Sequence, residues 1–174
     1  MAYDLTVSVR HASVETPFGR LLVAATERGV VRVAFPEEGD DAVLSELSSE
    51  LSSRVEPGHL DRERREVDEY FSGRRRAFDA PVDLGLVEGF GRKVLEATAR
   101  IPYGSVSTYG EVASRAGSRR AARAAGNALR RNPIPILVPC HRVIRSGGGL
   151  GGYAGREDRK AFLLSLEGSN GPAR

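Results

Sequence analysis

The stretch STYGEVASRAGSRRAARAAGNALRRN, residues 107–132, predicts two helices joined by a short turn. Thr108 is followed three residues later by Glu111, which is the capping-box pattern that opens a helix, and Gly117 is a typical helix end. We expect Ser118 to cap the second helix, whose alanines favour helical structure. Two helices across such a short Gly-Ser turn are a helix-turn-helix candidate, although many helical hairpins of this kind bind nothing.

The second predicted helix has a basic side and a packing side, because successive residues are about 100° apart around a helix. The residues on the basic stripe are Arg119, Arg123, Gly126 and Arg130. The residues on the packing side are Ala121, Ala122, Ala125 and Leu129. Gly126 costs roughly 1 kcal/mol of helix stability relative to alanine, and it permits the close approach of another surface. A neighbouring helix would fit there, and the adjacent arginines favour a DNA backbone.

Positive charge is concentrated around this motif. Residues 101–146 contain eight arginines and a single acid, Glu111, so the window has a charge of +7; because the chain has +3, the remainder has −4. The eight arginines are Arg115, Arg119, Arg120, Arg123, Arg130, Arg131, Arg142 and Arg145. Such a concentration favours a polyanionic partner, whereas the alternative is an arginine-rich face that is merely solvated.

The N-terminal half predicts two hairpins followed by helices. The stretches SVETPFGRLLVAAT (13–26) and ERGVVRVAF (27–35) each contain a turn and a run of apolar strand-forming residues. Residues 40–55 and 60–72 are acidic, amphipathic helix candidates, and the second ends near Gly73.

The segment GRRRAFDAPVDLG, residues 73–85, has the charge, proline and glycine content of a flexible linker. A helical pattern follows it. We therefore expect an α/β (α+β) fold with a small N-terminal α/β domain over residues 1–85, which has an antiparallel sheet and includes the linker at about 73–85. Residues 86–174 form a helical domain that contains the helix-turn-helix.

Composition excludes several classes of protein. The chain has 174 residues, 40% of them hydrophobic, which is enough for a core. Its single cysteine, Cys140, can form neither an internal disulfide nor a Cys-x-x-Cys zinc site. The first residues, MAYDLTVSVRH, predict no signal peptide, and no apolar run approaches the roughly 18 residues of a membrane span. We expect a cytoplasmic protein that binds no metal, associated with the nucleoid if it is bacterial.

Cys140 follows the proline-rich run NPIPILVPC, residues 132–140. Prolines at 133, 135 and 139 are incompatible with a central strand, so we expect a stiff, extended and buried segment. The neighbouring His141 is a base that can help to bring the thiol pKa down from about 8.5, as a nucleophile requires. The alternatives are an inert buried cysteine and a structural histidine.

The stretch NPIPILVPCHRVI, residues 132–144, closely resembles the active-site segment of the O6-alkylguanine-DNA alkyltransferases, which repair DNA by direct reversal. The resemblance extends without gaps over about residues 86–168, and the N-terminal hairpins also fit. It implies that Cys140 accepts the alkyl group, while His141 acts as a base through a bound water and Glu167 orients it. Asn132 matches the hinge asparagine that joins the recognition helix to the active-site segment.

The resemblance also implies contacts with DNA and with the lesion. Tyr109 matches the tyrosine that can protonate the leaving guanine, and Arg123 matches the arginine that takes the place of the extruded base. The expected DNA-binding residues are Arg123, Tyr109, Gly110, Ser118, Arg119, Gly126, Arg130 and Ser146. The expected substrate-pocket residues are Tyr153, Ala154, Val143, Gly155 and Phe90. The chain departs from the family pattern at Gly91 and Leu95, and at Arg156, where the family has a glycine.

The implied function is irreversible, stoichiometric transfer of the alkyl group from O6-alkylguanine in duplex DNA to Cys140, after nucleotide flipping and without a cofactor. O4-alkylthymine is left open as a second substrate. The expected partner is double-stranded DNA carrying alkylated guanine, not a membrane, and the protein is expected to be a monomer with cooperative binding along DNA left open. One alternative is an alkyltransferase-like protein that binds lesions without repairing them, although such relatives replace the acceptor cysteine. The other is a helix-turn-helix regulator.

Overall fold

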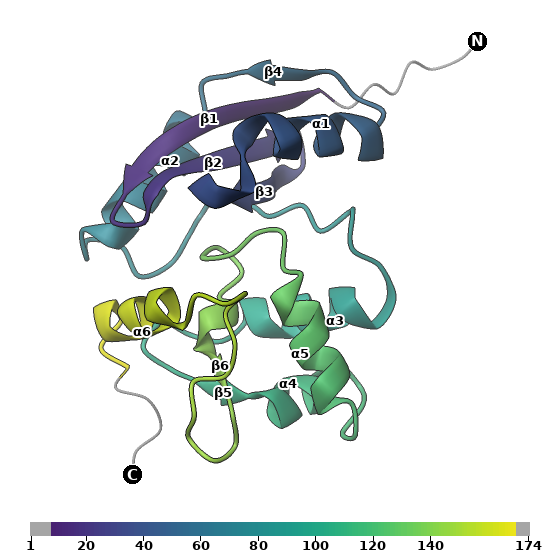
Figure 1. Ribbon diagram of the computed structural model, residues 1–174, viewed down its shortest axis with the longest axis vertical. Helices are drawn as coiled ribbons and strands as arrows, with labels where there is room; N and C mark the ends of the chain where they lie inside the picture. The colour runs from purple at the N-terminus through teal and green to yellow at the C-terminus, as the bar shows by residue number, and fades with distance from the viewer. Residues whose placement is uncertain (1–7, 170–174) are drawn as a thin grey trace. The chain divides into compact units, whose positions relative to one another are not determined.

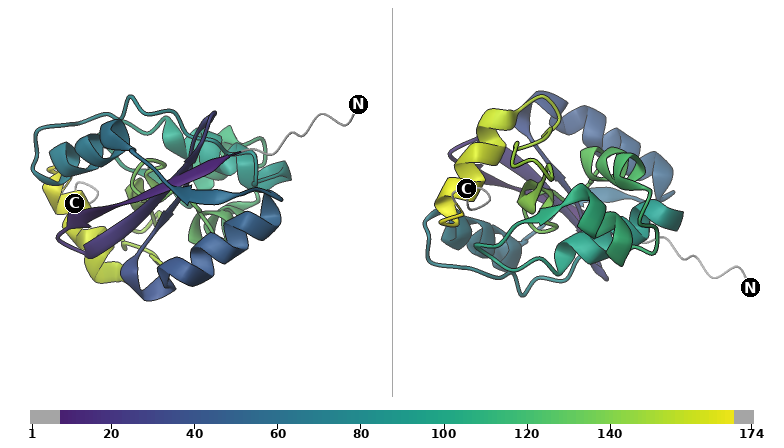
Figure 2. Two further views of the ribbon diagram at one scale, coloured as in Figure 1. Left: turned by 90° about the horizontal axis from the view of Figure 1, so that it is seen from above. Right: turned by 90° about the horizontal axis from the view of Figure 1, so that it is seen from below.

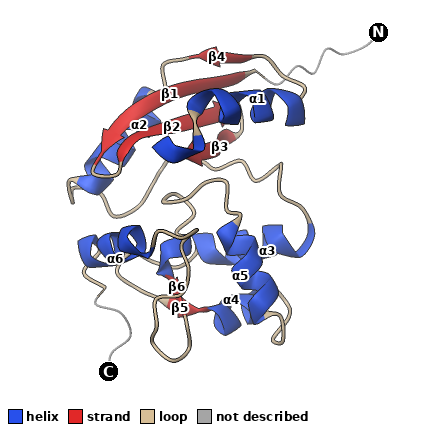
Figure 3. Cartoon of the chain, in the orientation of Figure 1, coloured by secondary structure: helices blue, strands red, loops and turns tan. Residues whose placement is uncertain are grey.

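The computed structural model describes residues 8–169; residues 1–7, where we expect no signal peptide, and residues 170–174 lie outside that part. The chain divides into two compact units, Met1–Leu86 and Val87–Arg174. Figure 3 shows that the long strands belong to the first unit and that the second is mostly helical, so the predicted mixed architecture is confirmed. Within residues 8–169, no helix has the length and apolar character needed to cross a membrane.

The first unit contains a four-stranded sheet in the order β3-β2-β1-β4 (Figure 1). The strands β1 (Val9–Thr16), β2 (Gly19–Thr26) and β3 (Gly29–Ala34) form the two predicted antiparallel hairpins. The fourth strand, β4 (Val55–Pro57), pairs with β1 in parallel and was not predicted.

The prediction of a helix over residues 40–55 is therefore correct up to residue 50 and wrong after it. Helix α1 covers Asp40–Glu50, and Ser52 then adopts a positive φ of 47° that ends the helical geometry. The chain turns there to reach the open edge of β1. Pro57 has no amide proton, which an edge strand tolerates and a central strand does not. Helix α2, Asp61–Phe71, matches its predicted range closely.

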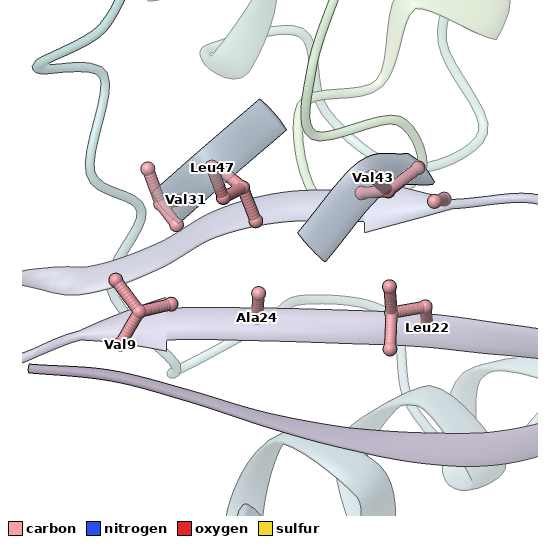
Figure 4. Packing of buried hydrophobic residues seen from close by; sticks show 7 residues of the cluster. Val9, Leu22, Ala24, Val31, Val43 and Leu47 are labelled. Atoms are coloured by element: carbon pink, nitrogen blue, oxygen red, sulfur yellow. The ribbon is translucent and has the colours of Figure 1, made fainter. Parts of the chain in front are cut away.

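One buried cluster of the first unit lies between α1 and the sheet. Val43 and Leu47 of α1 belong to this cluster with Leu22 and Ala24 of β2 and with Val9 of β1, as Figure 4 shows. Each fully buried leucine or valine of such a cluster contributes about 1.5–3 kcal/mol relative to an exposed one.

The segment 73–85 is attached to the first unit by hydrogen bonds. The amide of Val30 donates to Pro81 O (2.8 Å), and the amide of Asp83 donates to Val30 O (2.7 Å). The buried carboxylate of Glu66 accepts hydrogen bonds from the amides of Asp79 and Ala80, both at 3.0 Å. Much of the expected linker is thus fixed on this unit, and the domain boundary at residue 85 stays a prediction.

The second unit combines packed helices with a two-stranded parallel sheet (Figures 1 and 2). The helices are α3 (Gly89–Ala99), α4 (Tyr109–Arg115), α5 (Ala122–Arg130) and α6 (Glu157–Leu166). The strands are β5 (Ser107–Thr108) and β6 (Val143–Ile144). Because β5 leads directly into α4, its pairing with β6 brings the start of α4 beside the residues that follow Cys140.

The predicted capping box at the start of α4 is confirmed. The Glu111 amide donates to Thr108 Oγ1 at 3.2 Å, and the Thr108 amide donates to Glu111 Oε2 at 2.9 Å. At the other end, Gly117 has a φ of 99°, its amide donates to Ser114 O, and the Ser118 amide donates to Ala113 O. These two bonds form a Schellman motif, which satisfies the last carbonyls of the helix.

The prediction that Ser118 caps the second helix is wrong. Because its amide completes the Schellman motif of α4, Ser118 still belongs to the end of that helix, and α5 begins only at Ala122, with Ala121 as its N-cap and no side-chain cap. Arg119 therefore precedes α5 and does not share a helical stripe with Arg123. The packing side is confirmed at Ala125 and Leu129, which are buried.

Candidate active site

The segment before Cys140 is a compact loop and not the extended run that the prolines predicted. Pro135 and Val138 form an isolated bridge, and the Val138 amide donates to Ile134 O at 2.9 Å. Ile136, between them, has a φ of 75°. The prolines do limit regular strand pairing, but the chain satisfies its backbone groups by folding over itself.

Asn132 holds this loop from within. Its Nδ2 donates to Val138 O at 2.9 Å, and its Oδ1 accepts from the Ile134 amide at 3.0 Å. The residue is buried and lies directly after the end of α5. One side chain thus connects the end of the second helix of the helix-turn-helix to the loop that presents Cys140, and its role as a hinge asparagine stays a prediction.

Cys140 begins a short 3-10 helix, η2 (Cys140–Arg142), and only 9% of its surface is exposed. Burial raises the pKa of its thiol, because the thiolate loses solvation; hydrogen bonding to the Asn132 side chain and the charge of Lys160 lower it. The thiol is therefore protonated at rest, and reaction requires a base that removes its proton.

His141 and Glu167 form a fully buried pair beside Cys140. His141 Nε2 lies 2.8 Å from Glu167 Oε1. Because a carboxylate only accepts hydrogen bonds, Nε2 carries the proton and Nδ1 is left with a free lone pair. Among residues 8–169, Nδ1 has no hydrogen-bond partner. Burial lowers the pKa of His141, although Glu167 opposes this effect, so the imidazole is neutral near pH 7 and can accept a proton.

Arg142 is a site residue that the sequence analysis did not assign to the site. Its Nε donates to Glu167 Oε2 and its Nη2 to Glu167 Oε1, both at 2.8 Å, while Nη1 donates to Ile101 O at 2.6 Å. Glu167 follows the last residue of α6, and Gly168, with a φ of 73°, ends the helix there. This two-point ion pair fixes the carboxylate that holds His141.

Lys160 is the second residue that the sequence analysis missed. It lies on α6 and is completely buried. Its Nζ donates to Val143 O at 2.5 Å, to Gly152 O at 3.4 Å and to the Tyr109 hydroxyl at 3.5 Å. Burial lowers its pKa to about 8. The sequence did contain one hint of this residue: only two of the 26 basic residues are lysines, so each lysine stands out in a chain that otherwise uses arginine.

Tyr109 is the first residue of α4 and is packed against two glycines. A Cβ at Gly126 would lie 3.7 Å from the Tyr109 ring, and a Cβ at Gly151, which has a φ of 75°, would lie 2.3 Å from the hydroxyl oxygen. Gly126 thus lies against Tyr109 at ordinary van der Waals distance, and the DNA contact expected at Gly126 stays a prediction. Burial raises the pKa of Tyr109 and the charge of Arg145 lowers it, so the phenol stays protonated and able to donate.

The expected pocket residues fall into two groups. Val143 and Tyr153 are buried, whereas Ala154 and Gly155 are exposed and both have a positive φ. Phe90 is half-buried on α3. Their assembly into a guanine pocket stays a prediction.

The basic window identified in the sequence is largely a surface. Of its eight arginines, Arg142 is buried, and the other seven are exposed. Ser146 is exposed in the loop after β6, and Gly110 and Ser118 are half-buried in α4 and in the turn that follows it. No three His, Cys, Asp or Glu side chains between residues 8 and 169 cluster as a metal site requires.

Comparison with protein families accounts for nearly the whole chain. Residues 89–169 match the DNA-binding domain of 6-O-methylguanine DNA methyltransferase, and residues 9–84 match its ribonuclease-like domain. A constitutive methylated-DNA–protein-cysteine methyltransferase of Bacillus subtilis is 38% identical over 158 residues, covering 90% of this chain and 94% of that protein. A methylated-DNA–protein-cysteine methyltransferase of Methanosarcina acetivorans is 41% identical over 160 residues, covering 91% and 98%.

Solved structures show the same similarity. The crystal structure of Mycobacterium tuberculosis O6-methylguanine methyltransferase superposes with a TM-score of 0.76 at 35% identity, covering 95% of this chain and 96% of that one. The structure of Mycobacterium tuberculosis OGT in complex with DNA gives a TM-score of 0.76 at 34% identity and covers 96% of each chain.

Proposed function

Because the chain belongs to the 6-O-methylguanine DNA methyltransferase family, we propose that Cys140 accepts the alkyl group of O6-alkylguanine directly from duplex DNA. The activity is that of a methylated-DNA–protein-cysteine methyltransferase, its function is DNA repair by alkyl transfer, and DNA is its partner. The observation that carries the role of Cys140 is its position beside the buried His141–Glu167 pair. Since its partner is DNA and its relatives are DNA repair proteins, the location we propose is the cytoplasm.

The geometry supports a division of roles in the transfer. Neutral His141 takes the thiol proton at Nδ1, through a bound water as the family resemblance implies, and Glu167 stabilises the imidazolium that forms. The Cys140 thiolate attacks the alkyl carbon, so that an S–C bond forms as the bond from carbon to guanine O6 breaks. The electron pair remains on the guanine, which takes a proton from Tyr109. The thioether product has no leaving group for the return reaction, so each molecule reacts once.

DNA binding follows from the exposed arginines and from the helix-turn-helix. The alkyl group lies inside the duplex, so the nucleotide must be flipped out at a cost of a few kcal/mol. Phosphate contacts by the basic surface offset part of this cost. We propose Arg123, exposed in the first turn of α5, as the side chain that fills the vacated stack.

A mass measurement tests this function. After incubation with duplex DNA that contains O6-methylguanine, the intact protein is expected to gain one methyl group, and peptide mapping is expected to locate it on Cys140. The same DNA with unmodified guanine is the control. Tight binding without a gain in mass would instead support a lesion-binding protein or a helix-turn-helix regulator.

The role of Arg123 separates flipping from electrostatic contact. Arg123→Ala is expected to slow repair of duplex DNA by about 30-fold, which corresponds to roughly 2 kcal/mol of the flipping cost. Arg119→Ala is the matched control, because Arg119 is also exposed, lies in the turn before α5, and is expected to contribute only a phosphate contact. Single-turnover rates measured on duplex DNA compare the two variants.

The free base O6-benzylguanine needs no flipping, so Arg123→Ala is expected to react with it at the wild-type rate. An equal loss of rate on the duplex and on the free base would exclude the wedge role.

A further inference from the structure

The segment between α3 and β5 contacts Arg142 and the end of α6, to which Glu167 is attached. The carbonyl of Ile101 accepts a hydrogen bond from Arg142 Nη1 at 2.6 Å. The hydroxyl of Tyr103 donates to Leu166 O at 3.2 Å, and Leu166 is the last residue of α6, directly before Glu167. The reaction described above gives these contacts no part.

Tyr103 reaches both sides of the Arg142–Glu167 ion pair. Its hydroxyl holds the end of α6, and the Cζ atom of Arg142 lies 5.8 Å from the centroid of its ring. That distance is within the roughly 6 Å over which the face of an aromatic ring attracts a cation. A Cβ at Gly104, the next residue, would lie 3.3 Å from Glu167 O, so the backbone of the segment also passes close to the end of α6.

The carboxylate of Glu167 serves two donors on one oxygen. Its Oε1 accepts from His141 Nε2 and from Arg142 Nη2, each at 2.8 Å. A carboxylate oxygen has two lone pairs, so it satisfies both donors only while the guanidinium stays in place. A guanidinium that moved toward the imidazole would displace Nε2 from Oε1. The proton of the neutral imidazole could then move to Nδ1, and Nδ1 would no longer accept the thiol proton.

We propose that Tyr103 is a positioning residue for deprotonation of the thiol, because it holds Arg142 and the end of α6 in the arrangement that keeps Glu167 bonded to the imidazole. The proposal rests on the proposed function, in which His141 takes the proton of Cys140. The ring fixes the guanidinium from the side, and the hydroxyl fixes the backbone from which the carboxylate extends. Tyr103 therefore acts through other residues and takes no part in bond making.

The tautomer of His141 tests the proposal without DNA or guanine. The 15N shifts of an imidazole distinguish the ring nitrogen that carries the proton from the one that does not, and they are measured at about pH 8, where the imidazole is neutral. His11 and His59, the other two histidines of the chain, lie in the first unit and serve as internal references. In the wild type, Nε2 of His141 is expected to carry the proton. In Tyr103→Leu the two shifts are expected to move toward each other, because the proton is divided between the nitrogens.

The single-turnover rate of methyl transfer gives a second readout. Tyr103→Leu removes the ring and the hydroxyl, and it is expected to slow transfer about tenfold, a part of the roughly 10²–10⁴-fold that general base catalysis supplies. Tyr103→Phe keeps the ring and loses only the hydrogen bond to Leu166 O, so it is expected to be about threefold slower than the wild type. A graded loss of this kind shows that both contacts of the side chain contribute.

Val106→Ala is the matched control for loosening of the segment. Val106 is half-buried in the same segment, before β5, and its truncation removes neither a ring nor a hydroxyl. Its thermal stability is expected to fall, while the 15N shifts of His141 and the transfer rate stay at the wild-type values. Shifts displaced as far as in Tyr103→Leu would assign the effect to general loosening and overturn the proposal. Shifts and rate of Tyr103→Leu that match the wild type would overturn it as well.

Tyr103→Phe decides the matter if Tyr103→Leu fails to fold, because it removes one oxygen from a half-buried side chain and keeps the packing of the ring. Its 15N shifts are expected to move in the same direction as those of Tyr103→Leu and by a smaller amount. With Tyr103→Leu unfolded, a Tyr103→Phe variant that equals the wild type in both the shifts of His141 and the rate contradicts the proposal.

The two hypotheses can fail separately. If Cys140 takes no methyl group from O6-methylguanine DNA while the tautomer of His141 still depends on Tyr103, the proposed function fails and the positioning of the histidine stands. If methyl transfer occurs and neither its rate nor the tautomer depends on Tyr103, the function stands and the positioning role fails.

Discussion

Cys140→Ala is expected to abolish methyl transfer from O6-methylguanine DNA, while DNA affinity is expected to stay within about twofold of the wild type, since binding depends on charge at the arginine surface. Cys140 is the only thiol of the chain, so its replacement removes the acceptor that we propose. The measurement is methyl transfer from labelled duplex DNA, together with the dissociation constant for the same duplex at fixed salt.

Cys140→Ser separates nucleophilicity from packing. A serine hydroxyl has nearly the shape of the thiol but does not ionise near neutral pH, so this variant is expected to be as inactive as Cys140→Ala. Removal of methyl groups from DNA by either variant would assign the nucleophile to another residue. A large loss of DNA affinity would instead mean that Cys140 supports the structure of the binding surface.

Arg142→Met is expected to lower the free energy of unfolding by about 3–5 kcal/mol, because it leaves the Glu167 carboxylate buried without its cation. Arg142 is 7% exposed and donates three hydrogen bonds, two to Glu167 and one to Ile101 O. Urea denaturation followed by circular dichroism measures the change.

Arg145→Met provides the control for Arg142→Met. Arg145 lies three residues after Arg142 and is exposed, so its loss is expected to change the free energy of unfolding by about 0.5 kcal/mol or less. The double variant Arg142→Met, Glu167→Leu removes both charges, so it is expected to recover much of the stability that the single variant loses. If Arg142→Met lowered the free energy of unfolding by less than about 1 kcal/mol, water would have to reach the Glu167 carboxylate, and the Arg142–Glu167 pair would not be shielded from solvent.

Local patterns predicted the local structure well. The capping box of Thr108 and Glu111 and the two N-terminal hairpins depend on residues a few positions apart, and the structure contains them as expected. The errors arose where one element affects the next. Ser118 has the chemistry of an N-cap, but its amide is committed to the end of α4, which delays the start of α5.

Local sequence patterns could not predict which charged residues are buried at the site. Arg142 has the same letter as the seven exposed arginines of its window, and only the fold places it against Glu167, 25 residues away. Lys160 is likewise separated from Tyr109 by 51 residues, and the pairing of β5 with β6, which brings their surroundings together, is too short to leave a strand pattern. The family resemblance suggested Cys140, His141, Glu167 and Asn132, whose roles remain predictions.

The left-handed backbone of Ile136 implies that the loop before Cys140 stores strain. A β-branched residue at a φ of 75° costs on the order of 1–3 kcal/mol, which a glycine would largely avoid. The isoleucine side chain is 1% exposed, and its burial contributes about 1.5–3 kcal/mol. The two effects are similar in size, so replacing Ile136 with glycine would relieve the backbone and lose the packing with little net gain. The loop therefore keeps a conformation that its own backbone disfavours, and it is the surrounding packing that holds Cys140 where it can react.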